Sequence, residues 1–217
     1  MKLVLATHNR HKVEEIRDIL SGAPGELRGR IEILSLDSFP EIGEIEEDGE
    51  TLEENARKKA RAVFNFIQNS PKRSLRTKPK IDNFISLADD TGLEVDALGG
   101  RPGVYSARFS GENATYAQNN EKLLGELKGI PYERRTARFR CAISMIGERI
   151  DEIAIGEVPG KILDSPRGRN GFGYDPLFVP DGYDKTYAEM DSDLKNRLSH
   201  RARALLEAKR ILRRLSA

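Results

Sequence analysis

Apolar and polar positions alternate along the chain with periods that predict both strands and helices. The apolar run 2–6 predicts a buried strand, and apolar positions recur at helical spacing between residues 13 and 20. A second amphipathic helix is predicted over residues 52–67, because Thr51 and Glu54 form a capping-box pattern ahead of its apolar stripe. The chain therefore opens as strand, loop and helix, and a longer helix follows.

The second half of the chain combines strands with two further helices. The apolar run 84–88 predicts a strand that ends at Asp89 and Asp90. Residues 136–146 alternate strictly and 150–158 less cleanly, so the two segments predict an antiparallel hairpin. One helix is expected after the capping box of Thr115 and Gln118, and another from Ser199 to the end. This order of elements predicts a mixed α/β protein with a mixed sheet.

The length of 217 residues leaves one or two domains open, and we take one soluble domain over residues 1–217 as the default. The 36 basic residues nearly balance the 35 acidic ones, so no net field favours a nucleic acid polymer or a membrane surface. No segment reaches the length of about 20 apolar residues that spans a bilayer, and the N-terminus lacks a signal core. The single cysteine, Cys141, cannot form an internal disulfide and is interpreted as a core residue. We therefore expect a cytoplasmic protein with no membrane partner.

One segment differs in composition from the rest of the chain. Residues 70–80 contain Pro71, Pro79 and five basic residues, with no acidic residue among them. Such a composition cannot form a packed core. We expect a basic surface loop over residues 70–82, which can be shortened without loss of folding.

Candidate phosphate-binding residues lie where the first strand meets the first helix. Thr7, Asn9 and Lys12 occupy this position, at which free backbone N–H groups and the helix dipole attract phosphate. The alternative is that Asn9 only caps the helix and that Lys12 is solvated.

Two acidic groups are candidates for holding a hard cation. Glu46 to Asp48 and the pair Asp89–Asp90 offer the carboxylate oxygens that Mg²⁺ requires. The segment 46–48 has the alternative reading of a solvated loop. The pair is harder to explain without a ligand, because adjacent carboxylates on an apolar strand repel one another and lose hydration.

Candidate base-binding residues lie in the last third of the chain. The glycine-rich segment 167–176 allows close backbone approach beside Phe172 and Tyr174, and could stack a nucleobase. Its alternative is an ordinary turn with both rings in the core. Lys195 and residues 199–201 add basic donors, or are exposed cap residues. Neither a phosphate loop of the G-x-x-x-x-G-K-[ST] type nor a G-x-S-x-G nucleophile elbow occurs in the chain.

Five segments read in order carry a family resemblance. They are residues 6–12, 88–93, 99–108, 171–176 and 199–201. Together they resemble the inosine triphosphate pyrophosphatase family, over about residues 2–206. The resemblance implies a homodimeric α/β protein, with an elongated mixed β-sheet, flanking helices and two lobes around a central nucleotide cleft. It implies hydrolysis of ITP, dITP and XTP to the monophosphate and pyrophosphate, with Mg²⁺ as cofactor.

The resemblance also assigns roles to residues that match the family's motifs. It implies that Glu47 and Asp90 bind Mg²⁺ and that Asp90 is also the general base. The substrate-binding residues that it implies are Thr7, His8, Asn9, Arg10, His11, Lys12, Lys59, Thr91, Phe172, Gly173, Tyr174, Asp175, Lys195, His200 and Arg201. Thr91 stands where serine is commoner in the family and keeps the hydroxyl group. The segment 70–82 is longer than the usual connection.

Two other functions share these features. A non-catalytic nucleotide sensor would keep the basic and aromatic residues but has no need of Asp90. A nucleotide pyrophosphatase of a related fold and broader specificity would keep the acidic residues and accept other bases. A panel of nucleoside triphosphates separates the three possibilities.

Overall fold

The computed structural model describes residues 2–22, 31–69 and 83–216. The basic loop expected over residues 70–82 lies outside these ranges. The helices are α1 (Arg10–Gly22), α2 (Leu52–Asn69), α3 (Tyr116–Glu126), α4 (Ser192–Leu198) and α5 (His200–Ser216). No helix of the described part is long and apolar enough to cross a membrane.

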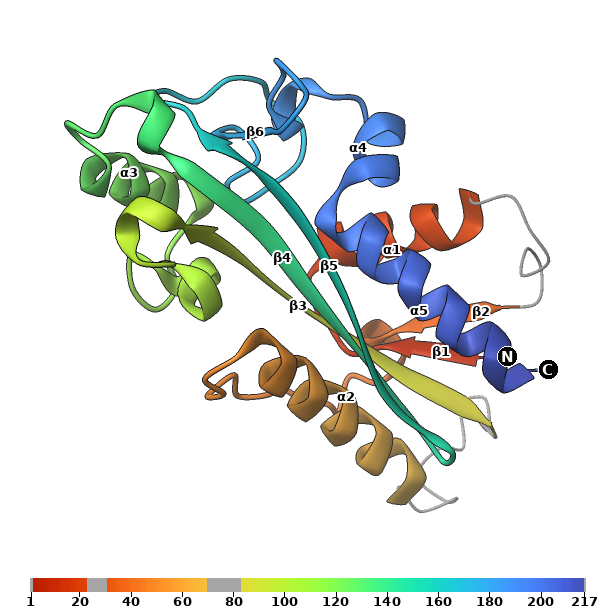
Figure 1. Ribbon diagram of the computed structural model, residues 1–217. Helices are drawn as coiled ribbons and strands as arrows, with labels where there is room; N and C mark the ends of the chain where they lie inside the picture. The colour runs from red at the N-terminus through yellow and green to blue at the C-terminus, as the bar shows by residue number, and fades with distance from the viewer. Residues whose placement is uncertain (1, 23–30, 70–82, 217) are drawn as a thin grey trace. The chain divides into compact units, whose positions relative to one another are not determined.

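Six strands form one mixed sheet in the order β2-β1-β3-β4-β5-β6 (Figure 1). They are β1 (Lys2–Leu5), β2 (Glu32–Ser35), β3 (Phe84–Val95), β4 (Thr136–Gly147), β5 (Ile150–Ile162) and β6 (Phe178–Pro180). Strand β1 is parallel to β2 and β3, whereas β6 is antiparallel to β5. This arrangement confirms the mixed α/β fold predicted from the sequence.

The predicted capping boxes are present. The N–H of Glu54 donates to Thr51 Oγ1 at 3.1 Å, and the N–H of Thr51 donates to Glu54 Oε2 at 3.3 Å. The equivalent reciprocal pair joins Thr115 and Gln118 ahead of α3. Each box satisfies N–H groups that a helix start leaves free, so α2 and α3 begin where the sequence places them.

Strand β3 is longer than the sequence predicts. The apolar run ends at Ala88, but the strand continues through Asp89 and Asp90 to Val95. The prediction that the strand ends at the two acidic residues is therefore wrong. The strand continues because lysines neutralise both carboxylates, and because Leu93 and Val95 are fully buried beyond them.

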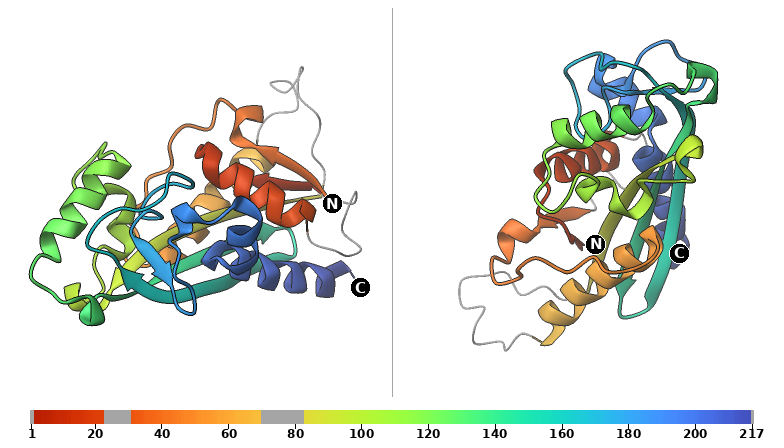
Figure 2. Two further views of the ribbon diagram at one scale, coloured as in Figure 1. Left: turned by 90° about the horizontal axis from the view of Figure 1, so that it is seen from above. Right: turned by 90° about the vertical axis from the view of Figure 1, so that its left-hand side faces the viewer.

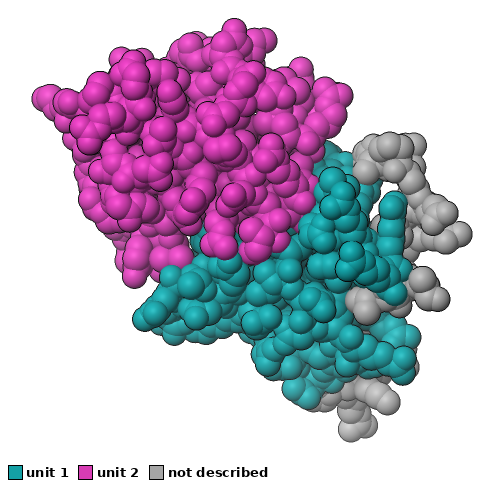
Figure 3. Space-filling view, in the orientation of Figure 1, with its two compact units in different colours: residues 1–90, 142–154, 205–217 teal, residues 91–141, 155–204 magenta. Residues whose placement is uncertain are grey.

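The described residues form two compact units, which Figure 3 distinguishes by colour. Unit 1 comprises residues 1–90, 142–154 and 205–217, and unit 2 comprises residues 91–141 and 155–204. Strands β3, β4 and β5 each contribute residues to both units. Each unit is described below by itself.

Each unit has its own hydrophobic core. In unit 1, Val4 of β1 and Ala88 of β3 pack with Ala60 and Val63 of α2. Because side chains alternate along a strand, the odd-numbered residues of β1 and of β3 up to Asp89 lie on the opposite face, toward α1 (Figure 2). In unit 2, Leu93 of β3 shares a core with Leu123 of α3 and Phe139 of β4.

Candidate active site

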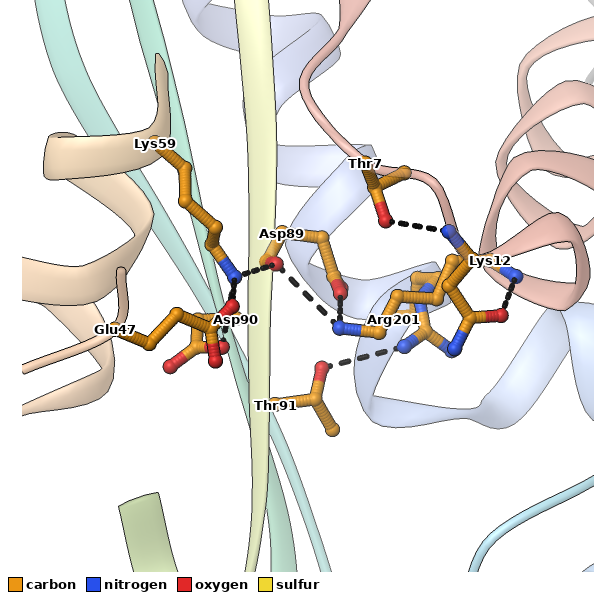
Figure 4. A network of polar contacts seen from close by, with 9 residues as sticks. Thr7, Lys12, Glu47, Lys59, Asp89, Asp90, Thr91 and Arg201 are labelled. Carbon is orange, nitrogen blue, oxygen red and sulfur yellow. Dashed lines mark hydrogen bonds and ion pairs between the residues drawn. The ribbon is translucent and has the colours of Figure 1, made fainter. Parts of the chain in front are cut away.

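Asp89 and Asp90 direct their side chains to opposite faces of β3 (Figure 4). Successive residues of an extended strand point to opposite sides of a sheet. Asp90 therefore shares a face with Ala88 and α2, and Asp89 faces α1. The two adjacent carboxylates do not form the single pair that their sequence suggests.

On the α2 face, Lys59 connects two carboxylates. Its Nζ lies 2.9 Å from Asp90 Oδ1 and 2.5 Å from Glu47 Oε1. The same ammonium group donates to the backbone carbonyl of Asp89 at 3.0 Å. Lys59 is buried on the inner side of α2, so these contacts are shielded from bulk water.

On the α1 face, Lys12 occupies the corresponding position beside Asp89. Its Nζ lies 2.5 Å from Asp89 Oδ1, and the Asp89 side chain is completely buried. Lys12 is thus not a solvated side chain, which was the alternative reading of the sequence. Each buried carboxylate has its own ammonium partner, which offsets the cost of burying two adjacent negative charges.

One oxygen of the Asp90 side chain accepts no hydrogen bond from the described part of the chain. Oδ2 is buried, and no group among residues 2–22, 31–69 and 83–216 donates to it. Burial raises the pKa of Asp90 above its ordinary value, although Lys59 and Lys12 act to lower it. Burial works to lower the pKa of Lys59, but Asp90 and Glu47 together raise it above its ordinary value. The carboxylate thus retains an acceptor for a proton or a cation.

Only one residue of the acidic segment 46–48 faces this group. Glu47 is half-buried and contacts Lys59, whereas Asp48 is exposed and contacts Lys58 at 2.5 Å. The hydrogen bond from Lys58 lowers the pKa of the Asp48 carboxyl. Glu46 is exposed. The structure therefore selects Glu47 from the three candidates.

The carboxylates present fit a Mg²⁺ ion that is bound jointly by protein and substrate better than one that is bound by protein groups alone. Within the described ranges, no group of three or more His, Cys, Asp or Glu side chains could hold a metal ion. Glu47 and Asp90 supply two carboxylates, and Asp90 Oδ2 has no protein partner there. Mg²⁺ is commonly bound through one or two carboxylates together with substrate phosphates. The residues present fit that mode.

The loop before α1 is shaped by short polar contacts. The N–H of Asn9 donates to Thr7 Oγ1 at 3.1 Å, and the N–H of Lys12 donates to Asn9 Oδ1 at 3.3 Å. Asn9 therefore caps α1. Exposed side chains nearby belong to His8, Arg10 and His11.

A second polar group lies in unit 2, around Asp175. Lys195 Nζ lies 2.6 Å from Asp175 Oδ2, and both side chains are buried. The same oxygen accepts the N–H of Phe172 at 2.8 Å. A Cβ at Gly171 would lie 2.1 Å from this oxygen, so the turn requires glycine there. Lys195 lies on α4, a short helix ahead of the one that the sequence predicts from Ser199.

Phe172 and Arg201 also belong to this group. The Arg201 guanidinium carbon lies 5.7 Å from the centre of the Phe172 ring, and Lys195 Nζ lies 5.0 Å from it. Arg201 also donates to Thr91 Oγ1 at 3.3 Å. An aromatic ring beside two cations offers a stacking surface and hydrogen-bond donors together.

Three of the expected base-binding residues have packing roles in unit 2. The buried Tyr174 hydroxyl donates to the backbone carbonyl of Ser106 at 2.9 Å, and Gly173 accepts a hydrogen bond from Asn120. The His200 ring stacks on Phe139 with a centroid distance of 4.6 Å. Tyr174 thus lies in the core, as the alternative reading of the glycine-rich segment proposed for both rings, whereas Phe172 is only half-buried.

The separate role of Asp89 is the feature that sequence reasoning missed. The adjacency of the two acidic residues in the chain predicts a single acidic cluster. The available signal was strand periodicity, since Asp89 and Asp90 differ by one position and must face opposite sides of any strand that contains both.

Comparisons with known proteins agree on one family. The model of the Ham1 family matches residues 3–211. A dITP/XTP pyrophosphatase of Thermoanaerobacter pseudethanolicus is 47% identical over 216 residues, which are 99% of this chain and 98% of that protein. A dITP/XTP pyrophosphatase of Geobacter sulfurreducens is 49% identical over 205 residues, with coverage of 94% and 92%.

A solved structure gives the same result for the fold. The Ham1 protein of Staphylococcus aureus is 34% identical, covers 98% of each chain and superposes with a TM-score of 0.78.

Proposed function

Because the chain belongs to the Ham1 family, as its match over residues 3–211 shows, we propose that it hydrolyses non-canonical purine nucleoside triphosphates. The substrates are dITP, ITP and XTP, and the products are the nucleoside monophosphate and pyrophosphate. Relatives named dITP/XTP pyrophosphatase, 47–49% identical over nearly the whole chain, support this assignment. In the structure, the observation that carries it is the set of buried and half-buried lysine–carboxylate contacts on both faces of β3.

Glu47 and Asp90 would hold Mg²⁺ together with oxygens of the substrate phosphates. When bound, the ion would supply positive charge that offsets the negative charge developing on the phosphates during the reaction. Lys59 and Lys12 act in the same sense, since Lys59 places a buried ammonium group beside Glu47 and Asp90, and Lys12 places a half-buried one beside Asp89. Glu47, Lys59 and Asp90 therefore form one group of two carboxylates and one ammonium, whose remaining negative charge suits a divalent cation.

Asp90 is proposed as the general base. Its Oδ2 is buried and has no donor within the described ranges, so it can accept the proton of a water molecule. The water oxygen then bonds to the α-phosphorus, and the bond between that phosphorus and the bridging oxygen of pyrophosphate breaks. This route forms no covalent enzyme intermediate, so the reaction requires no Ser or Cys nucleophile.

The base is proposed to bind at the unit 2 residues. Phe172 offers a ring face, and Lys195 and Arg201 offer donors beside it. Hypoxanthine and xanthine carry a 6-oxo acceptor where adenine carries an amino donor, so these cations favour the oxo bases. Guanine shares the oxo group, and its exclusion has to act on its 2-amino group.

The assembly and location of the protein are part of the same proposal. The resemblance to the inosine triphosphate pyrophosphatases supports a homodimer. The balanced charge and the single cysteine support action in the cytoplasm on the pool of free nucleotides.

Hydrolysis in ¹⁸O-labelled water tests the proposed reaction. Attack at the α-phosphorus places the label in the monophosphate and leaves pyrophosphate unlabelled. Label in pyrophosphate, or release of orthophosphate and a nucleoside diphosphate, would contradict the proposed route. Binding of ITP without turnover in the presence of Mg²⁺ would indicate a nucleotide sensor.

A further inference from the structure

Asn55, in the first turn of α2, has an unusual environment for an asparagine in a helix. Its side chain is completely buried, and its Oδ1 accepts the backbone N–H of Gly49 at 2.8 Å. Asn55 lies one helical turn before Lys59, so the two residues share a face of α2. The side chain thus connects the inner face of the helix to the segment that follows Glu47.

Gly49 is fitted closely against this helix start. A Cβ at position 49 would lie 2.7 Å from Asn55 Oδ1 and 2.9 Å from the Glu54 Cβ, and real Cβ atoms do not approach so closely. The next residue is also held, since the N–H of Glu50 donates to Glu54 Oε2 at 2.8 Å. Asn55 and Glu54 therefore fix consecutive backbone groups of the segment that leads into α2.

Glu47 lies next to the backbone segment that Asn55 and Glu54 hold. Glu47 precedes Gly49 by two residues, and its carboxylate contacts Lys59 on the same helix that carries Asn55. We propose that Asn55 is a positioning residue, which holds residues 47–49 against the first turn of α2 and so fixes the Glu47 carboxylate beside Lys59 and Asp90. This inference rests on the proposed function, in which Glu47 binds Mg²⁺.

A purely structural role explains Asn55 less well. Its Nδ2 is buried, and no acceptor for it occurs among the described residues. A buried amide with an unsatisfied N–H group is unfavourable, and asparagine is a weaker helix former than alanine. An apolar side chain would stabilise this helix position better, so the benefit of Asn55 lies in the contact with Gly49.

The dependence of activity on Mg²⁺ tests the proposal. Loss of one hydrogen bond to the loop should raise the Mg²⁺ concentration for half-maximal ITP hydrolysis roughly fivefold in Asn55→Ala. The kcat at saturating Mg²⁺ should stay within about twofold of the wild type, because the reacting groups are unchanged. Asn65→Ala is the matched control, since Asn65 is an exposed asparagine on the same helix and its loss should change neither quantity.

A double-mutant cycle separates positioning from general destabilisation. If Asn55 acts through Glu47, Asn55→Ala should no longer alter the Mg²⁺ requirement in a Glu47→Gln background. An equal effect of Asn55→Ala in both backgrounds would overturn the proposal.

Amide hydrogen exchange of Gly49, measured by NMR, gives a readout that does not involve activity. Exchange should accelerate at Gly49 in Asn55→Ala, but not in Asn55→Asp, which keeps the accepting oxygen. Gly49→Ala provides a second route to the same loosening, because its Cβ forces the segment away from α2. It should reproduce the raised Mg²⁺ requirement even where Asn55→Ala fails to fold.

The failures of the two proposals are distinguishable. A wild-type protein that hydrolyses no triphosphate, or hydrolyses it without Mg²⁺, would overturn the proposed function and the role of Asn55 with it. A Mg²⁺-dependent wild type whose Asn55→Ala and Gly49→Ala variants show unchanged Mg²⁺ dependence would overturn only the role of Asn55.

Discussion

At the scale of single residues, burial and strand alternation give Asp89 and Asp90 different roles. Asp89 is enclosed and paired with Lys12 on the α1 face, so its carboxylate serves to hold a lysine. Asp90 shares Lys59 with Glu47 and keeps one oxygen without a donor in the described part of the chain. Two residues of the same type and adjacent numbers are therefore expected to respond differently to substitution.

Asp90→Asn should reduce kcat for ITP by about 10³-fold or more, because an amide can neither accept the proton from water nor bind Mg²⁺ as a carboxylate does. Nucleotide affinity should change by less than about tenfold, since Lys12 and Lys59 remain. Steady-state turnover and equilibrium binding measure the two effects. Asp18→Asn, at an exposed position of α1, is the control and should retain full activity. Normal turnover by Asp90→Asn would remove Asp90 from the mechanism.

Arg201→Ala should lower kcat/KM for ITP about 10–100-fold while changing the value for ATP much less. A charge-assisted hydrogen bond to the 6-oxo group contributes about 1.5–3 kcal/mol, and adenine cannot accept it. The ratio of the two efficiencies reports the change in specificity. Arg210→Ala, an exposed arginine of the same helix, controls for loss of charge. Equal losses for both nucleotides would indicate that Arg201 acts through its contacts with Thr91 and Phe172 and not on the base.

At the scale of elements, the sequence predicts helix starts better than it predicts the length of β3. The capping boxes of α2 and α3 are local patterns, and both form as expected. Strand β3 extends beyond its apolar run because Asp89 and Asp90 find lysines on α1 and α2, which are distant in the chain. No helix-start pattern in the sequence predicts the role of Asn55 either, since its partner Gly49 lies before the capping box. Partners that lie outside the local sequence patterns thus account for what the sequence could not predict.

Gly156→Ala should destabilise the protein by several kcal/mol, about as much as a severe core substitution. A Cβ at this position of β5 would lie 2.2 Å from the His200 backbone oxygen and 2.3 Å from the Ala204 nitrogen, at the start of α5. Thermal unfolding measures the change. Gly125→Ala in α3, where a Cβ meets no atom within 4 Å, should be neutral or slightly stabilising. Similar midpoints for both variants would show that β5 and α5 pack less closely than described.

The pKa of Lys209 predicts a pH dependence of stability. Its Nζ donates to the carbonyls of Ile19 and Leu20 at the end of α1, and burial, with Arg213, lowers its pKa below 10.5. The folded state therefore releases this proton at lower pH than the unfolded state does. Stability contributed by this residue should rise as the pH increases through the lowered value towards 10.5.

Urea unfolding of the wild type and Lys209→Met across the alkaline range isolates this contribution. The difference in unfolding free energy, wild type minus variant, should increase with pH. A difference that stays constant or falls would contradict the lowered pKa of Lys209.

At the scale of the whole molecule, the chain consists of two units with separate cores that share three long strands. Asp90 and Thr91 are consecutive residues of β3, and they belong to unit 1 and unit 2 respectively. In the proposed function Glu47, Lys59 and Asp90 act on the phosphates, and other side chains, Phe172, Lys195 and Arg201, select the base. Substitutions should therefore be able to change the turnover rate without changing the preference for a base, and the reverse.

The central claim is Mg²⁺-dependent hydrolysis of oxo-purine triphosphates to monophosphate and pyrophosphate. It is tested most directly by incubating the protein with the triphosphates of inosine, deoxyinosine, xanthosine, adenosine, guanosine and the pyrimidines, with Mg²⁺ or with a chelator, and quantifying every product. We predict pyrophosphate and monophosphate from the first three, a kcat/KM at least about 10²-fold above that for ATP, and no turnover with the chelator. Comparable efficiencies across the panel, turnover without metal, or orthophosphate as the product would contradict it.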